Sequence, residues 1–400
     1  MVATLLPVDH VIAELLAKVS PTRETITCLL DDALGRYLAA DITSVVDVPP
    51  EANSAMDGYA VNSSEIVEDG VYEVSARIPA GSVGAPLVAG TVARIFTGAP
   101  IPPGADAVVI QEDTESAGDR GNCVAIKVAS VPGENVRPRG QDISQGTTIL
   151  KRGRRLSPQD LGLVASVGIA QVEVFKPLTI SIMSTGDELI EPPNSLQPGQ
   201  IYNSNRFALA GLLKNMGMNV VDLGVIEDTP EATEKALRRG AQESDCILST
   251  GGVSVGEEDH VRAVVENLGQ LDIWRIAIKP GKPLAFGDVL GIPFFGLPGN
   301  PVSTFVTFII IARPYLVAYQ GGNQVENEFY VGEAEFDYKG GGRREYLRVQ
   351  AVASRDAVVL RKFSKQGSGV MSSVSWANAL VEVEIGQHVK PGDKLKYYLL

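Results

Sequence analysis

The chain has few cysteines and few histidines. Three cysteines (Cys28, Cys123 and Cys246) lie far apart and are odd in number, which argues against a disulfide framework and against a thiolate metal site. The three histidines are equally scattered. Any metal bound here is therefore expected to be a hard ion held by carboxylates, such as magnesium.

Positive charge and long hydrophobic runs are also scarce. Lys and Arg number 35 against 48 Asp and Glu, so the net charge is −13. A strongly acidic chain is a poor general nucleic-acid binder, and an anion site would have to gather its cations locally. No apolar run approaches the roughly 18 residues of a membrane helix. The N-terminus lacks a basic segment followed by an apolar core, so we expect a cytoplasmic protein with no membrane partner.

The 400 residues leave room for two to four domains. The spacing of apolar residues predicts helices over 7–19 and 29–40. From 45 to 145 the chain is dense in Pro and Gly, and short runs at 72–75, 93–96, 107–111 and 124–128 predict a small β domain. A further helix is predicted over 156–167 after a Ser-Pro start.

Residues 177–326 alternate between strand and helix patterns. Strands are predicted over 178–183, 219–224, 246–248, 273–278 and 293–297, and helices over 204–216, 229–241, 261–268 and 300–319. This spacing predicts a mostly parallel, three-layer α/β domain. Residues 327–400 hold short alternating runs at 329–336, 345–351, 358–361, 380–385 and 394–399, which predict a β-barrel or sandwich.

The stretch C-I-L-S-T-G-G-V-S-V-G-E-E-D-H (246–260) reads as a buried strand, a small-residue turn and a helix start. Glycine loops bring backbone N–H groups close to an anion, and a helix start favours negative charge. Taken alone, the stretch fits a tight turn without a ligand equally well.

Four other loops end predicted strands of the same domain. They carry S-T-G-D-E (184–188), V-I-E-D (225–228), K-P-G-K-P (279–283) and G-L-P-G-N-P (296–301). Parallel strands point the same way, so all five loops should meet at one edge of the sheet, where open α/β sheets bind ligands.

These loops combine acids, lysines and free backbone amides. Glu188 and Asp228 could instead be helix caps or solvated loop acids. Lys279 and Lys282, held in a stiff Pro-Gly turn, suit a preorganised anion site. The mixture predicts a phosphorylated ligand with a divalent ion, and phosphoryl or pyrophosphate chemistry.

Two loops of the β domain place polar residues unusually. Asp57 lies in N-S-A-M-D-G-Y-A, and Thr97 begins the rigid T-G-A-P-I-P-P-G segment. Asp57 capping a turn and Thr97 ending a strand is the simpler interpretation of both. A third loop, V-R-P-R-G-Q-D-I, carries Asp142.

Several motifs together are highly specific. The chain contains S-A-M-D-G-Y-A, F-T-G-A-P-I-P-P-G-A-D-A-V-V, R-G-Q-D-I, S-T-G-D-E-L, G-Q-I-Y-N-S-N, S-T-G-G-V-S-V-G-E-E-D, K-P-G-K-P and G-L-P-G-N-P-V-S. In this order, from about residue 5 to 400, it resembles molybdopterin molybdenumtransferase, the family of the gephyrin E domain.

The resemblance implies an L-shaped, four-domain subunit in an elongated homodimer. The implied domains are a small one from 21–44 and 146–176, a β-rich one at 45–145, the molybdopterin-binding α/β domain from 1–20 and 177–326, and a C-terminal β-barrel at 327–400. The resemblance also implies a cleft assembled across subunits, because Asp57, Thr97 and Asp142 lie in a different domain from the glycine loop.

The implied activity is insertion of molybdate into adenylylated molybdopterin. Magnesium-dependent cleavage of the pyrophosphate linkage would release AMP and molybdenum cofactor. Implied partners are the molybdopterin adenylyltransferase and downstream molybdoenzyme maturation factors.

Positions matching the family's motifs give the candidate site. The acids, as catalytic residues or magnesium ligands, are Asp57, Asp142, Glu188, Asp228 and Asp259, with Glu188 and Asp228 as the expected metal ligands. The expected substrate-binding residues are Thr97, Thr250, Gly251, Gly252, Ser254, Gly256, Lys279, Lys282, Pro298, Pro301, Arg348 and Ser368. Of these, Arg348 and Ser368 match the family's oxyanion-contacting pair through R-E-Y-L-R and K-Q-G-S-G.

Three other functions stay open on the sequence. One is a gephyrin-like scaffold, although no second enzyme domain or long linker supports it. Another is a protein that binds molybdopterin without catalysis. The third is a tungstate-using homologue, because the two oxyanions have nearly the same shape and charge.

Overall fold

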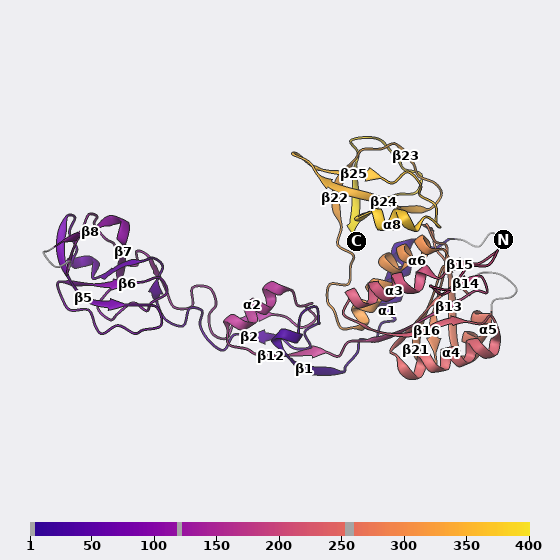
Figure 1. Ribbon diagram of the computed structural model, residues 1–400, viewed down its shortest axis with the longest axis horizontal. Helices are drawn as coiled ribbons and strands as arrows, with labels where there is room; N and C mark the ends of the chain where they lie inside the picture. The colour runs from indigo at the N-terminus through magenta and orange to yellow at the C-terminus, as the bar shows by residue number, and fades with distance from the viewer. Residues whose placement is uncertain (1–4, 118–121, 253–259) are drawn as a thin grey trace.

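The computed structural model describes residues 5–117, 122–252 and 260–400. The chain is elongated, with a β-rich region at one end and a small region in the middle (Figure 1). An α/β region and the C-terminal region lie together at the other end. The five loops of the predicted site belong to the α/β region, so the candidate site lies at this end of the molecule.

The β-rich region is built on one six-stranded sheet in the order β7-β4-β6-β5-β9-β8. Its strands are β4 (Gly58–Val61), β5 (Gly70–Ile78), β6 (Thr91–Ile95), β7 (Ala107–Ile110), β8 (Thr114–Ala117) and β9 (Cys123–Ile126). The short strands β3 (Asn53–Ser54) and β10 (Val136–Arg137) pair beside it. Alternate strand residues form its two small hydrophobic cores, as expected for a folded-over sheet.

The middle region joins segments that are distant in sequence. Strand β1 (Thr25–Leu29) pairs with β12 (Gln171–Phe175), and β2 (Ile42–Thr43) pairs with β11 (Thr148–Leu150). Helix α2 (Pro158–Ser166) covers them and begins with a capping box between Ser157 and Asp160.

The predicted helix over 29–40 is wrong. Only a 3₁₀ turn forms, at Leu30–Asp32, and Gly35 then takes a left-handed φ of 75°. The following backbone at Tyr37 and Leu38 bridges to Arg155 and Val174. Pairing with other strands has therefore overridden the helical spacing of the apolar residues.

The α/β region is organised by a six-stranded sheet in the order β16-β13-β17-β21-β20-β18. Its strands are β13 (Thr179–Thr185), β16 (Asn219–Ile226), β17 (Cys246–Thr250), β18 (Gly269–Arg275), β20 (Pro283–Val289) and β21 (Ile292–Leu297). Four of them, β16, β13, β17 and β21, are parallel. After β13 in the chain, β14 (Leu189–Ile190) and β15 (Ile201–Tyr202) pair to form a separate two-stranded sheet.

Helices cover both faces of this sheet. Helices α4 (Pro230–Glu243) and α5 (His260–Leu268) pack on one face, and α3 (Ser204–Asn215) and α6 (Pro301–Thr307) pack on the other. Neighbouring β17 residues accordingly enter different cores, Ile247 on the α4–α5 side and Leu248 on the α3–α6 side. The predicted three-layer, mostly parallel arrangement is confirmed.

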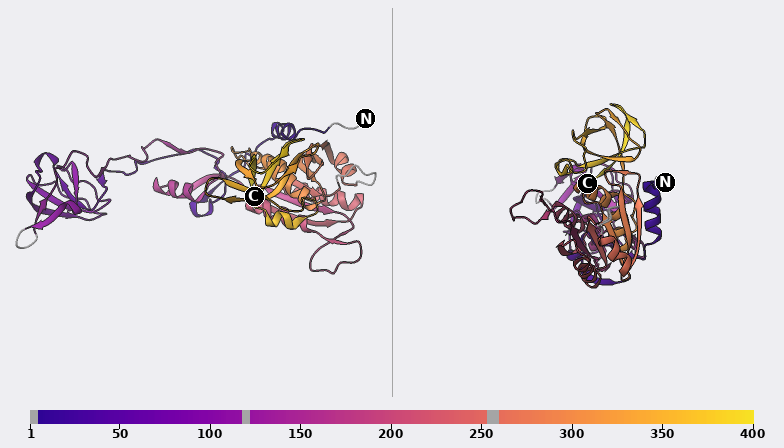
Figure 2. Two further views of the ribbon diagram at one scale, coloured as in Figure 1. Left: turned by 90° about the horizontal axis from the view of Figure 1, so that it is seen from above. Right: turned by 90° about the vertical axis from the view of Figure 1, so that its right-hand side faces the viewer.

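The first helix, α1 (Val8–Ala17), packs on the α/β region although it comes before the other regions in sequence. Figure 2 shows it on the outer flank of that region. Val8, Val11 and Leu15 are buried in the same core as the central strands. The chain therefore begins in the α/β region, leaves it to form the other regions, and returns.

One helical segment is long and apolar. Helix α6 continues through a π segment at Phe308–Ala312 into α7 (Arg313–Tyr319), making 19 residues from Pro301 to Tyr319 with a mean hydropathy of 1.6. By length and composition alone this segment could cross a membrane, although Ser, Thr and Arg side chains interrupt its apolar residues. In this fold it is 72% buried, as the core helix of an α/β layer is.

The last strands of the sheet differ from the prediction. The predicted strand at 273–278 divides into β18 and the short β19 (Ile278–Lys279), and β20 was not predicted. Strand β20 is antiparallel to both β21 and β18. Two reversals restore the direction, so β18 runs the same way as the four parallel strands and ends at the same edge.

The C-terminal region is a closed barrel of β24-β25-β22-β28-β26, closed by pairing of β24 with β26. Its elements are β22 (Tyr330–Ala334), β24 (Arg344–Ala353), β25 (Val358–Lys362), α8 (Met371–Trp376), β26 (Ala379–Val383) and β28 (Lys394–Leu399), with a small pair of β23 (Tyr338–Lys339) and β27 (His388–Val389). The predicted barrel is confirmed.

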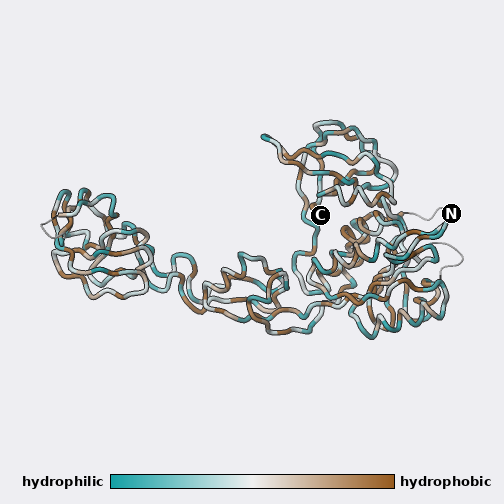
Figure 3. The backbone as a smooth tube through the Cα atoms, viewed as in Figure 1, coloured by the Kyte–Doolittle hydropathy of each residue, from teal (hydrophilic) through white to brown (hydrophobic). Residues whose placement is uncertain are grey.

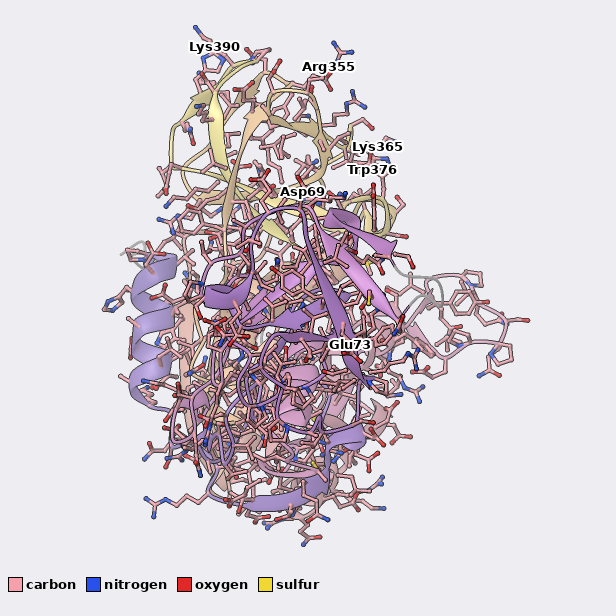
Figure 4. The ribbon with its side chains drawn as sticks, turned by 90° about the vertical axis from the view of Figure 1, so that its left-hand side faces the viewer. Asp69, Glu73, Arg355, Lys365, Trp376 and Lys390 are labelled. Atoms are coloured by element: carbon pink, nitrogen blue, oxygen red, sulfur yellow. The ribbon has the colours of Figure 1, made fainter. Side chains whose placement is uncertain are left out.

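Strand β19 of the α/β region adds to this barrel by pairing with β24. Hydrophobic residues, coloured brown in Figure 3, occur along the backbone of every region. In the end-on view of Figure 4, Asp69 and Glu73 mark the β-rich region in front and Lys390 the tip of the barrel.

Candidate functional site

A basic cavity lies between the carboxyl edge of the α/β sheet and the barrel. Its volume is about 670 Å³. Four cations line it: Arg275, Lys279, Lys282 and Arg343. Among the described residues that line it there is no carboxylate. A cavity lined in this way favours an anion with several oxygens, because several positively charged hydrogen-bond donors face the same space.

An acidic cavity of about 510 Å³ adjoins it at the same edge. Glu188, after β13, and Asp228, after β16, both line it, and the lining within the described chain includes no Lys or Arg. The Glu188 carboxylate lies against the backbone of Gly186, where an added Cβ would be 2.5 Å from its Oε2. Glycine at position 186 therefore leaves the space that this carboxylate occupies.

The two cavities share one wall, formed by Gly251, Gly252, Gly299 and Asn300. Gly251 and Gly252 adopt left-handed φ values of 87° and 65°. A Cβ on Gly252 would lie 2.3 Å from Cγ2 of Val261, so both conformation and space require glycine there. The wall between the cavities is thus backbone, with few side chains to screen one cavity from the other.

Hydrogen bonds and ion pairs hold the ends of the strands and the start of α3 near this wall. The Thr250 hydroxyl donates to Ser184 Oγ at 3.0 Å, and Asn203 Nδ2 donates to Glu191 at 2.9 Å. Arg206 forms ion pairs with Glu191 and Asp222. Thr250 is only 3% exposed, so its hydroxyl serves the packing of the strand ends.

The basic cavity's cations differ in how firmly they are held. Lys279 Nζ lies 2.9 Å from the buried carboxylate of Glu345. Burial would raise the pKa of Glu345, but hydrogen bonds from Tyr338, Lys279 and the Gly341 N–H together lower it. The side chain of Arg343 donates to the carbonyls of Ile278 and Gly281 at 3.0 and 3.3 Å. Lys282 is exposed to solvent.

Comparison with known proteins places this architecture in a family. The model of the MoeA N-terminal region (domains I and II) matches residues 6–168, and that of the MoeA C-terminal region (domain IV) matches 333–400. Between them, residues 181–318 match a probable molybdopterin-binding domain. A Haemophilus influenzae protein named molybdopterin molybdenumtransferase is 36% identical over 384 residues, 95% of each chain.

The chain belongs to the MoeA family. A Nostoc molybdopterin molybdenumtransferase is 34% identical over 94% of this chain and 89% of its own. A Pyrococcus horikoshii structure described as a molybdopterin biosynthesis MoeA protein matches with a TM-score of 0.84 and 27% identity, over 99% of this chain and all of that one. The predictions of this family and of a transferase of molybdenum cofactor biosynthesis are confirmed.

Most of the predicted residues of the α/β region, together with Ser368 of the barrel, meet in this MoeA-family chain. Glu188, Asp228, Thr250 and Pro301 line the acidic cavity, and Lys279, Lys282, Pro298 and Ser368 line the basic one, with Gly251 and Gly252 between them. Ser254, Gly256 and Asp259 lie outside the described residues.

Arg348 is placed differently from the prediction. It is 1% exposed, does not line the basic cavity, and donates to Ser373 Oγ and to the carbonyls of Tyr346 and Gly367. Burial lowers its pKa to about 10. Arg348 therefore supports the loop that carries Ser368 instead of lining the cavity itself.

Sequence reasoning missed Arg275 and Arg343, which line the cavity in its place. Arg275 ends β18, and Arg343 follows a Gly-Gly-Gly turn directly before β24. The sequence feature that could have identified them is an arginine at the end of a strand or directly after a glycine turn. The sequence alone did not show that the barrel forms one wall of the cavity.

The predicted residues of the β-rich region lie elsewhere. Asp57 Oδ1 accepts from the backbone N–H and the hydroxyl of Thr97, both at 2.8 Å, and these bonds lower the pKa of Asp57. Asp142 is exposed on the connection back to the middle region. The strands of the β-rich region lie at the opposite end of the molecule from the α/β region (Figure 1), and none of these three residues is in the described lining of either cavity.

The protein by itself supplies only some of the oxygen ligands that a magnesium ion needs. Across the described ranges no group of three or more His, Cys, Asp or Glu side chains could hold a metal ion. Glu188 and Asp228 supply two hard oxygen donors to one cavity. Magnesium commonly takes one or two carboxylates together with substrate phosphates and water, so this pair fits a metal that arrives with a phosphorylated substrate.

Proposed function

We propose that this chain inserts molybdate into adenylylated molybdopterin and cleaves its pyrophosphate linkage, releasing AMP and molybdenum cofactor. The observation that carries the proposal is a basic and an acidic cavity separated by one glycine wall. The reaction joins a tetrahedral dianion to a substrate whose pyrophosphate needs a divalent ion. Two adjoining cavities of opposite charge match these two requirements.

In this proposal molybdate binds in the basic cavity. Lys279, Lys282, Arg275 and Arg343 hold its oxygens, with Ser368 and Ser303 at the wall. The volume of about 670 Å³ exceeds that of a single oxyanion and leaves space for the molybdopterin end of the substrate. Cations fixed on two different regions suit an anion that must be aligned with a second reactant.

The pyrophosphate linkage lies over the glycine wall, with the acidic cavity on its other side. Glu188 and Asp228 would hold magnesium, which would supply positive charge to the pyrophosphate oxygens. The amides of the glycine wall and the side chains of Asn205 and Asn300 orient the phosphates. The same acids keep a second anion such as free molybdate out of this cavity.

The β-rich region completes the site from a second copy of the chain. Asp57 and Thr97 are preorganised by their mutual hydrogen bonds, and the β-rich region that carries them lies at the other end of its own chain from the α/β region (Figure 1). A homodimer in which each β-rich end covers the partner's cavities would bring Asp57, Thr97 and Asp142 to the substrate. A molybdopterin adenylyltransferase would supply that substrate, and maturation factors of molybdoenzymes would accept the product.

A direct assay tests the proposal. Purified protein is incubated with adenylylated molybdopterin, magnesium and molybdate, and AMP is separated by liquid chromatography. We expect AMP and molybdenum cofactor in equal amounts, and no AMP when EDTA is added. Binding of adenylylated molybdopterin without AMP release, under conditions where another family member turns over, would contradict the enzyme proposal and favour a binding protein. Replacing molybdate by tungstate shows which oxyanion is used.

A further inference from the structure

The K-P-G-K-P loop (279–283) belongs to the α/β region but is held by the barrel. Strand β19, which ends at Lys279, pairs with Arg344 and Glu345 of β24. Arg343 donates to the carbonyls of Ile278 and Gly281 on either side of the turn. The basic wall of the cavity is thus fixed by hydrogen bonds from another region of the chain.

Glu345 is the polar centre of this contact. It is 1% exposed, and its carboxylate accepts from the Tyr338 hydroxyl at 2.5 Å and from the Gly341 N–H at 2.9 Å. Its third partner is Lys279 Nζ at 2.9 Å, and Lys279 is also its neighbour in the β ladder. A buried carboxylate with three donors is stable as an anion and has one preferred position.

The pairing changes what Lys279 can do. Its side chain is 44% exposed and lines the basic cavity. An ammonium has three protons. One points to Glu345, so two remain for a ligand, in directions set by the pair. Lys282, in contrast, is exposed and forms no ion pair among the described contacts, so it supplies charge without a fixed direction.

We propose that Glu345 is a positioning residue for oxyanion binding: it holds the Lys279 ammonium at the wall of the basic cavity, and through it the C-terminal barrel sets how the α/β region recognises its anion. The inference rests on the proposed function, because it takes the basic cavity to be the molybdate site. Glu345 acts through Lys279 and does not touch the anion.

The charges predict in which direction molybdate affinity changes when Lys279 and Glu345 are replaced singly and together. Removing Lys279 leaves Glu345 as a buried negative charge without its cation, next to the anion site. Lys279→Met should therefore weaken molybdate binding by about tenfold or more, through loss of a donor and through repulsion. Adding Glu345→Gln to that variant removes the repulsion, so the double variant should bind molybdate more tightly than Lys279→Met alone.

Glu345→Gln alone keeps the size of the side chain but frees the ammonium. We expect molybdate binding about threefold weaker, because a mobile Lys side chain must be ordered by the ligand. The KM for molybdate should rise, while kcat and the magnesium concentration at half-maximal rate stay unchanged. General loosening of the fold would instead change all three. Tyr338→Phe, which removes one donor to Glu345 and retains both charges, should give a smaller shift in the same direction.

The experiment measures molybdate binding by calorimetry and AMP release for the wild type, the three single variants and the double variant. Glu335→Gln is the matched control, since Glu335 forms an exposed ion pair with Arg361 in the same barrel. It should bind molybdate like the wild type. If Glu345→Gln does not fold, Tyr338→Phe and Lys279→Met still test the inference.

Two results would overturn the positioning role. One is unchanged or tighter molybdate binding in both Glu345→Gln and Tyr338→Phe. The other is a double variant that binds no better than Lys279→Met. A wild type that does not bind molybdate overturns it as well. A wild type that binds molybdate but releases no AMP contradicts the proposed reaction alone, and the binding series then still tests Glu345.

Discussion

The acidic and basic cavities lie at one sheet edge, yet their chemistry is opposite. Across the sheet, Asp228 follows β16 and Glu188 follows β13, whereas Gly251 follows β17 and Gly299 follows β21. Three of the four cations lie at or after the end of β18, at the other end of the same row: Arg275 ends that strand, and Lys279 and Lys282 follow it. The fourth, Arg343, comes from the barrel. Strand order thus places the acidic loops at one end of the edge, the glycine loops in the middle and the basic loops at the other end. A ligand that lies along this edge contacts all three kinds of loop.

This sorting explains how an acidic protein can bind an anion. The net charge of −13 is an average over the whole chain, while the four cations of the basic cavity are gathered from three segments. Fields inside a low-dielectric cleft depend on the nearest charges. Three of the four described residues shared by the two cavities are glycines, so the wall between them offers little side-chain obstruction to one substrate that reaches both.

The largest effect should come from removing the acidic cavity's charge. In the double variant Glu188→Gln/Asp228→Asn we expect AMP release to fall by about 100-fold or more, because magnesium loses both carboxylates. Molybdate affinity should stay within about twofold of the wild type, because the two cavities bind separately. Rates are measured across a magnesium titration, and binding by calorimetry.

Glu73→Gln, on the exposed face of the β-rich region (Figure 4), is the control and should leave AMP release unchanged. Parallel loss of molybdate binding in the acidic double variant would show that the two cavities do not act separately.

The shared wall should affect both cavities at once. Gly252→Ala places a Cβ against Val261 at a left-handed φ, so we expect a loss of about 1–3 kcal/mol of unfolding free energy. The half-saturation values for molybdate and for magnesium should both rise. Urea unfolding and the two titrations measure these effects. A change in only one titration would contradict the shared wall.

Loss of one basic side chain should affect only one ligand. Arg275→Ala is expected to weaken molybdate binding by about tenfold, as removal of a charge-assisted donor does. Its magnesium dependence should match the wild type. Lys390→Ala, at the exposed tip of the barrel (Figure 4), removes the same charge away from the cavities and should change neither. Equal losses in both variants would indicate an effect of net charge alone.

The smallest effect concerns stability at low pH. The folded-state pKa of Glu345 is lowered, so its stabilising contribution is complete above the unfolded pKa of about 4.3 and is lost as pH falls through the folded value. Between about pH 5 and pH 3, the unfolding free energy of Glu345→Gln should therefore fall less steeply than that of the wild type. Urea unfolding at several pH values measures the slope. An unchanged slope would contradict ionic pairing of Glu345.

Much of the site could be predicted because strand ends carry readable chemistry. Glycine pairs, Pro-Gly turns and acids directly after apolar runs identified most of the residues that line the two cavities. Arg348 was assigned to the cavity because a matching motif does not show burial, and the fold places its guanidinium beneath the loop. Arg275 and Arg343 were missed because neither lies in a distinctive motif.

The sequence by itself determined most of the alternation of strands and helices in the α/β region, and the chemical type of each loop, because these depend on local spacing and composition. Only the tertiary structure decided which loops are neighbours. Along the chain, Glu188 and Asp228 precede the glycine loop and the lysines precede Gly299, and strand order converts this sequence into two separate cavities. The pairing of β19 with the barrel joined Lys279 to Glu345, because hydrogen bonding between strands disregards distance along the chain.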